Sequence, residues 1–130
     1  MENILLTQVM GALLGFLGVL FGAFGAHYLK GKLKDSQLQA FETGVRYQLL
    51  HAVLLLVLSF NLSFTSDVEN YIVKAILIGT LLFSFSIYGL VLSDGFGKKW
   101  RFLGPVTPLG GVLLLAGWAL LGYHFMANFL

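Results

Sequence analysis

The sequence predicts an all-α integral membrane protein, a four-helix bundle folded as one transmembrane domain over residues 1–130. Composition is the first reason. Hydrophobic residues make up 58% of the chain and charged residues 11%, whereas a soluble domain carries about 25% charged residues. The mean hydropathy of +0.86 also shows that the chain is apolar on average. The second reason is four long apolar runs, and the third is that Lys and Arg gather in two of the connections between them.

Each apolar run is long enough to cross a bilayer, whose hydrocarbon core of about 30 Å needs roughly 20 helical residues. The runs cover about residues 4–29, 44–62, 71–92 and 108–126. We expect helices because lipid cannot satisfy open backbone groups, and the runs do not alternate as barrel strands do. The first run is long and no Lys or Arg precedes it, so we expect a retained span and not a cleaved signal peptide.

Local residues predict where the second and third helices begin. Ser36 is a good N-cap, and a helix over residues 36–62 measures roughly 40 Å, longer than the bilayer core. We therefore expect its first part to lie in the membrane interface, with a bend at Gly44. Ser66 and Glu69 have the spacing of a capping box before the third helix.

The distribution of Lys and Arg predicts the orientation, because short cytoplasmic loops carry an excess of both. The first connection holds Lys30, Lys32, Lys34 and Arg46, and the third holds Lys98, Lys99 and Arg101. The second connection has Lys74 beside Asp67 and Glu69, and the termini have no Lys or Arg. We expect both termini to lie outside and connections one and three to lie in the cytoplasm.

A glycine stripe runs along the first span. Its members are Gly11, Gly15, Gly18, Gly22 and Gly25. Spacings of four and three residues place them on one helix face, where the lack of side chains lets another helix approach closely. We expect this helix to be a neighbour in the same bundle. The alternative is a seam between two copies of the chain.

Ionisable and polar residues within spans are functional candidates. The candidate polar cluster consists of His27, Tyr47, Gln48, His51 and Glu42. With Lys30 and Arg46 taken as the membrane boundary, His27 and His51 lie at similar depth, so they are expected neighbours. A metal site, a site that handles protons or a solute, and a hydrogen-bond cluster that fixes helix register all remain open. We expect the last of these, because no metal-binding spacing such as HExxH is present.

Other chemistry has little support in the sequence. There is no cysteine, which excludes disulfides and thiolate metal ligands. No phosphate loop, Ser-His-Asp arrangement or paired buried carboxylate occurs, so we expect no enzyme, cofactor, bound metal or nucleic-acid partner. Lys98, Lys99 and Arg101 are candidate contacts for anionic lipid headgroups. The alternative is that these cations only set the topology.

Several motifs in order resemble those of the domain-of-unknown-function 423 family. They are Gly22-Ala23-Phe24-Gly25-Ala26-His27, Thr43-Gly44 with Tyr47-Gln48 and His51, Phe83-Ser84 with Ser86 and Tyr88, Thr107-Pro108-Leu109-Gly110-Gly111, and Gly117-Trp118. The resemblance covers most of the chain. It implies a small multi-span helical protein of the inner membrane, and it implies no catalytic activity.

Taken together, these patterns predict a multi-pass protein of the cytoplasmic membrane with a non-enzymatic role in structure or in binding lipids or a partner. Membrane lipids, another protein and a second copy of the chain are the candidate partners. The alternative function is a small transporter or lipid-handling protein that uses the polar cluster.

Overall fold

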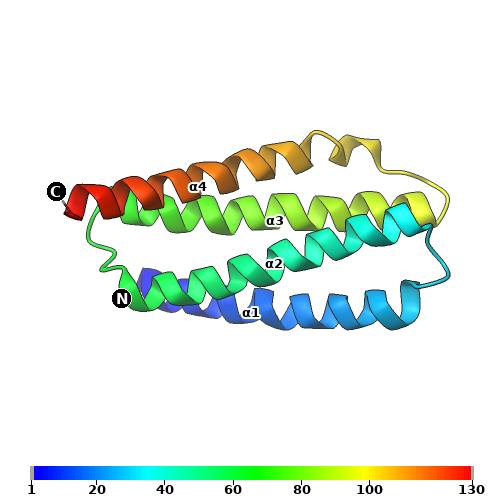
Figure 1. Cartoon of the computed structure of the whole chain (residues 1–130), viewed down its shortest axis with the longest axis horizontal. Helices are drawn as coiled ribbons and strands as arrows, with labels where there is room; N and C mark the ends of the chain where they lie inside the picture. The colour runs from blue at the N-terminus through cyan, green and yellow to red at the C-terminus, as the bar shows by residue number, and fades with distance from the viewer. Residues whose placement is uncertain (1, 130) are drawn as a thin grey trace.

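The computed structural model describes residues 2–129, and its regular structure is helical. The elements are α1 (Glu2–Phe24), a π-helical turn η1 (Gly25–Leu29), α2 (Asp35–Asn61), α3 (Asp67–Gly95), a 3-10 turn η2 (Arg101–Leu103) and α4 (Val106–Phe129) (Figure 1). Four segments are long and apolar enough to cross a membrane: α1 with η1, α2, α3, and η2 with α4. The prediction of four apolar helices of membrane-span length is therefore confirmed.

The four helices form an open, staggered row and not a closed ring (Figure 1). Successive helices pack against each other, whereas α1 and α4 do not meet, and no Cα atom of α2 comes within 8 Å of one in α4 within residues 2–129. In the most apolar window of each span, 22% of α1 and of α4 is buried, against 44% of α2 and 39% of α3. The two outer helices are therefore exposed over most of their circumference.

Two details of the helix ends differ from the sequence prediction. α2 begins at Asp35, and the side-chain oxygen of Gln37, not Ser36, accepts a hydrogen bond from the backbone N–H of Lys34 at 2.9 Å. α2 also continues through Gly44 without a break. Gly44 serves close packing, because a Cβ there would lie 2.8 Å from the ring of Tyr88.

The capping box before α3 is confirmed. The Ser66 hydroxyl accepts a hydrogen bond from the backbone N–H of Glu69, and the Glu69 carboxylate accepts one from the backbone N–H of Ser66. The same carboxylate accepts further bonds from Ser63, and Glu69 is only 4% exposed. This carboxylate therefore ties the α2–α3 connection to the first turn of α3.

The glycine stripe of α1 faces α2. A Cβ on Gly18 would lie 2.6 Å from Cδ2 of Leu49, and one on Gly25 would lie 2.8 Å from the Phe41 ring. Such distances are shorter than ordinary contacts, so a larger residue at either position would force the facing side chain to shift. The stripe therefore packs against α2 of the same chain, as we expected from the sequence.

α3 and α4 use the same device. A Cβ on Gly110 would collide with the backbone nitrogen of Phe83 and lie 2.9 Å from the carbonyl oxygen of Gly79. A Cβ on Gly117 would lie 2.6 Å from Ile76. Gly122 points away from the other helices, with nothing within 4 Å. Glycine therefore brings each outer helix close to its neighbour along one face.

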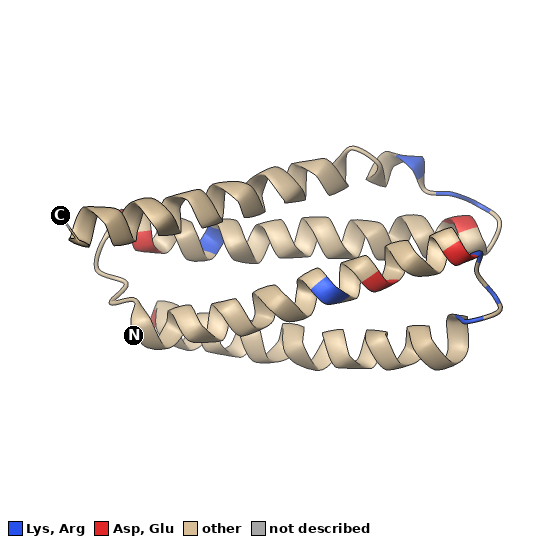
Figure 2. Cartoon of the chain, viewed as in Figure 1, with Lys and Arg blue, Asp and Glu red and all other residues tan. Residues whose placement is uncertain are grey.

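Charge separates the two ends of the molecule. The α1–α2 and α3–α4 connections lie at one end (Figure 2), which we call the basic end. It carries six cations, Lys30, Lys32, Lys34, Lys98, Lys99 and Arg101, against two carboxylates, Asp35 and Asp94. The other end carries Glu2, Asp67 and Glu69, with Lys74 on α3. Arg46 is not a residue of the first connection, as the sequence suggested, but lies within α2.

Candidate functional site

A buried hydrogen-bond chain at the centre of the row joins three helices. Gln48 of α2 is fully buried. Its amide nitrogen donates to the carbonyl oxygen of Leu14 in α1 at 2.8 Å, and its amide oxygen accepts from the Tyr88 hydroxyl in α3 at 2.6 Å. Close by, the Ser84 hydroxyl donates to the carbonyl oxygen of Gly44 at 2.7 Å. These bonds fix the register of α1, α2 and α3.

His51, one turn farther along α2, joins that helix to α4. Its Nε2 lies 3.1 Å from the indole nitrogen of Trp118, and its Nδ1 lies 2.7 Å from the carbonyl oxygen of Tyr47. An indole nitrogen can only donate, so Nε2 must accept, and the ring proton must then be on Nδ1, which donates to Tyr47. This arrangement requires a neutral imidazole with both nitrogens engaged.

The polar interior is closed by its own bonds. Among residues 2–129, no buried side-chain nitrogen or oxygen lacks a hydrogen-bond partner, and no group of three His, Asp or Glu side chains is placed to hold a metal ion. A metal or a transferred proton would have to displace Trp118 or Tyr47 from His51. The cluster is therefore suited to holding helices in register, which is the interpretation favoured by the sequence.

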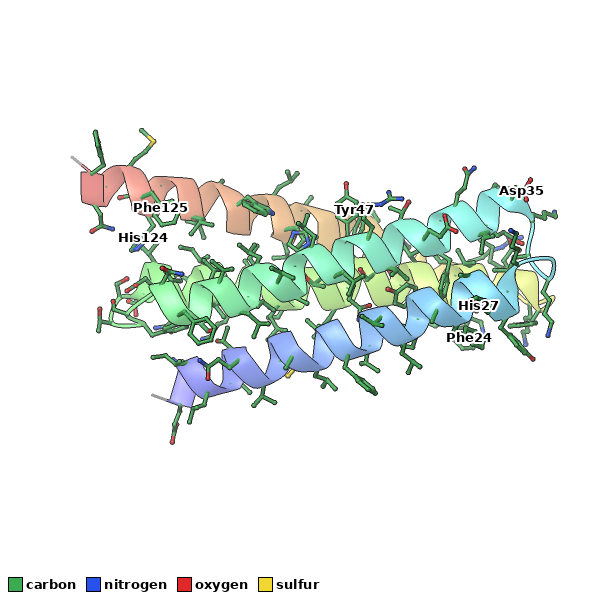
Figure 3. All side chains as sticks on the ribbon, turned by 60° about the horizontal axis from the view of Figure 1, so that its bottom comes forward. Phe24, His27, Asp35, Tyr47, His124 and Phe125 are labelled. Carbon is green, nitrogen blue, oxygen red and sulfur yellow. The ribbon has the colours of Figure 1, made fainter. Side chains whose placement is uncertain are left out.

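The structure brings together only part of the predicted cluster. Gln48 and His51 are buried, and Tyr47 is 39% exposed while its ring packs against Phe83 and His51. His27 and Glu42 are exposed and form no hydrogen bond with the others within residues 2–129. Figure 3 shows His27 near the end of α1, close to the level of Asp35, and Tyr47 well along α2.

The pairing of α1 with α2 explains why His27 and His51 are not neighbours. Gly11 lies against Leu56, and Gly18 lies against Leu49. Continuing this register places His27 level with Ala40, so His51 is eleven residues (40 to 51) farther along, or about 16 Å. The expected proximity is wrong because it assumes that Lys30 and Arg46 lie at one depth, whereas this register places Lys30 level with Gln37, nine residues before Arg46.

Two partners of the site were not assigned to it from the sequence. Tyr88 and Trp118 belong to the motifs of the family resemblance, but they lie 40 and 67 positions from the residues that they bind. Only the helix register brings them together. Apart from those motifs, the sequence signal for each is a polar group within an apolar span.

An apolar groove lies beside His51. It has a volume of about 560 Å³ and runs between α2 and α4 over α3. Its lining includes Leu50, Phe83, Val112 and Leu115, with Trp118 at one end. Few of these side chains can bind water, so the groove is suited to hydrocarbon and not to an aqueous path.

The candidate lipid contacts lie at the basic end. Lys99 and Arg101 line a cavity of about 410 Å³ together with Gln37 and Asp94, and Lys98 lines a separate cavity beside Trp100. Within the described part of the chain, none of these three cations has a carboxylate oxygen within 4.0 Å. Their charges are therefore available to an external anion.

Comparisons with known proteins agree with this architecture. The family model described as "Protein of unknown function (DUF423)" matches residues 21–111. The chain is 38% identical to a UPF0382 membrane protein of Staphylococcus haemolyticus (87% of this chain, 88% of the relative). It is 37% identical to the UPF0382 membrane protein YwdK of Bacillus subtilis (87% and 89%) and 39% identical to the UPF0382 inner membrane protein YgdD of Escherichia coli (87% and 83%). No solved structure matches the chain.

Proposed function

The chain belongs to the DUF423 family, whose similar relatives are named as membrane proteins, and from this premise we propose a function. It is a non-catalytic, multi-pass protein of the cytoplasmic membrane that binds anionic lipids at its cytoplasmic face. The relatives' names assign no activity. The proposal therefore rests on the chemistry of this chain.

The charge separation supports an orientation with the basic end in the cytoplasm. Six Lys and Arg side chains lie in the two connections at that end, whereas Lys74 is the cation toward the other end. Excess Lys and Arg in short loops keeps those loops on the cytoplasmic side. Both termini then lie outside, and the basic end faces the leaflet that carries a negative surface potential.

The observation that carries the proposal is the set of uncompensated cations before α4. Lys98, Lys99 and Arg101 are exposed and have no carboxylate partner within residues 2–129. Near an anionic surface, each such cation contributes about 1 kcal/mol of attraction. A topology signal alone needs positive charge but no cavity, whereas Lys99 and Arg101 line one.

The polar interior gives less support to catalysis or to transport. A proton relay through His51 needs a ring nitrogen with a free proton or lone pair, and both nitrogens are bound to Trp118 and Tyr47. A transport path needs water or polar groups along it, and the groove beside His51 is mainly apolar. The non-catalytic interpretation follows from these two features.

Lipid retention tests the proposal. The purified protein is exchanged into mixed micelles that contain equal parts of phosphatidylglycerol and phosphatidylcholine, and native mass spectrometry identifies the lipids that stay bound. We expect phosphatidylglycerol to be preferred. The combined variant Lys98→Gln, Lys99→Gln, Arg101→Gln should reduce that preference by about tenfold or more, because it removes the cations that line the two cavities before α4.

The matched control neutralises the other connection at the same end, with Lys30→Gln, Lys32→Gln and Lys34→Gln. This variant removes the same net charge, and we expect it to keep most of the preference. Equal loss in both triple variants would mean that only diffuse charge attracts the lipid. No preference in the unmodified protein would remove the proposal altogether.

A further inference from the structure

The apolar groove and the basic cavity lie end to end along one face of α3. Phe83 lines the groove, and Leu90 and Asp94 line the cavity. Leu90 and Asp94 lie seven and eleven positions after Phe83. At 100° per residue, the three residues therefore lie within about 40° of one another around the helix axis. On α2, Gln37 of the cavity and His51 of the groove are also about 40° apart.

Both spaces are bounded on the same two sides. α2 forms one side of each, through Gln37 and through Leu50. The other side is the α3–α4 segment, with Arg101 and Gly104 at the cavity and Pro108 where α4 borders the groove. We call the groove and the cavity together the α2/α4 trough. It is apolar toward the middle of the spans and basic at its end.

This distribution of charge matches one class of molecule. The apolar part has about 560 Å³, within the range of about 300–1,000 Å³ that is usual for ligand pockets. The basic part presents Lys99 and Arg101, which can bind a phosphodiester. A hydrocarbon chain joined to a phosphodiester is a glycerophospholipid.

Asp94 refines the headgroup. Its Oδ2 accepts a hydrogen bond from Gln37 Nε2 at 2.9 Å, and its Oδ1 accepts none within residues 2–129. Its free oxygen can accept a hydrogen bond from a headgroup hydroxyl. Lys99, Arg101 and Asp94 together carry a net charge of +1, which complements a lipid with one negative charge and a hydroxylated substituent, as in phosphatidylglycerol, better than a zwitterionic lipid.

We propose that the α2/α4 trough binds one phosphatidylglycerol molecule, with an acyl chain in the groove and its phosphate between Lys99 and Arg101. This inference rests on the proposed function and gives it a defined site. Trp118 forms part of the groove wall and is 44% exposed, so its indole is in contact with the bound chain. Trp118 is therefore a reporter of occupancy within the site.

The experiment uses Trp118 fluorescence in a Trp100→Phe background, which leaves one tryptophan because the chain has two. The protein is placed in bilayers of unlabelled phosphatidylcholine. Brominated phosphatidylglycerol is added in increasing small fractions in one series, and brominated phosphatidylcholine in the other. Brominated acyl chains quench indole fluorescence on contact. We expect brominated phosphatidylglycerol to half-quench Trp118 at about a tenfold lower fraction than brominated phosphatidylcholine, because two cations hold its headgroup.

Filling the groove should abolish this difference. Val112 lines the groove and is 60% exposed, so Val112→Phe occupies space without disturbing the helix contacts. Gly111→Leu is a second filling variant, since a Cβ there meets the Phe83 ring at an ordinary 3.7 Å. The control is Gly122→Leu, on the same helix but outside the trough. It should quench as the parent does.

Each alternative gives a distinct result. If Trp118 is not quenched by either lipid, protein such as a second copy covers the trough, and the proposal is wrong. If phosphatidylethanolamine quenches as well as phosphatidylglycerol, an ammonium group binds Asp94, and the headgroup assignment is wrong. A third outcome is that the filling variants leave the difference in quenching between the two lipids unchanged while lipid retention still depends on Lys98, Lys99 and Arg101. In that case the proposed lipid site in the trough is wrong, and the proposed function stands.

Discussion

Gly110→Leu is expected to lower the free energy of unfolding by about 3 kcal/mol or more, the upper part of the range for overpacked sites. A Cβ at this position would collide with the backbone nitrogen of Phe83 and lie 2.8 Å from its Cα. These are backbone atoms in the middle of α3, so they cannot rotate away as a side chain can. α4 must separate from α3, and among residues 2–129 no other long helix packs its backbone against α4.

Gly122→Leu is the matched control, because the same substitution is made on the same helix. Gly122 has nothing within 4 Å, so its new side chain enters lipid, and the change should stay within about 0.5 kcal/mol. Unfolding by a denaturing detergent, followed by circular dichroism, measures both variants. Equal stability of the two would show that α3 and α4 do not pack as described.

Gln48→Leu is expected to destabilise the protein by roughly 1–2 kcal/mol. The substitution keeps similar volume but removes the acceptor of the Tyr88 hydroxyl, which is then buried without a partner. Adding Tyr88→Phe removes that hydroxyl as well. Because replacing both partners of a buried bond costs less than orphaning one, the double variant should regain much of the lost stability.

Tyr47→Phe provides the control for this pair. The Tyr47 side chain is 39% exposed, and its hydroxyl forms no hydrogen bond within the described residues, so its loss should change stability little. Thermal unfolding of the four variants in one detergent completes the comparison. A double variant as unstable as the sum of its two single changes would contradict the bond between Gln48 and Tyr88.

The four spans and one packing face were predictable because each depends on local sequence. An apolar run fixes the length of a membrane helix, and glycine spacing fixes a face regardless of what lies opposite. Gly18 and Gly25 were therefore placed correctly on a packing face. The sequence did not identify α2 as their partner, because glycine spacing alone does not distinguish one neighbouring helix from another or from a second copy.

The polar site was predictable only in part because it depends on register between helices. The place of Gln48 and His51 in the site could be predicted from their positions on α2. The place of Tyr88 and Trp118 depends on the register of α3 and α4 relative to α2, which the sequence does not give. His27 was misplaced because an error in the assumed depth of Arg46 shifts every residue counted from it. The open row was not predictable either, because apolar content does not distinguish a ring from a row.

The most direct test of the central claim is the side of the membrane on which the basic end lies. The chain has no cysteine, so single cysteines can be introduced at Lys32, Lys99 and Asp67 and challenged in intact cells with a thiol reagent that does not cross the membrane. With the basic end in the cytoplasm, Lys32→Cys and Lys99→Cys stay unlabelled until the cells are opened, and Asp67→Cys is labelled at once. Labelling of Lys32→Cys and Lys99→Cys in intact cells, with Asp67→Cys protected, would contradict both the orientation and the lipid site proposed at that end.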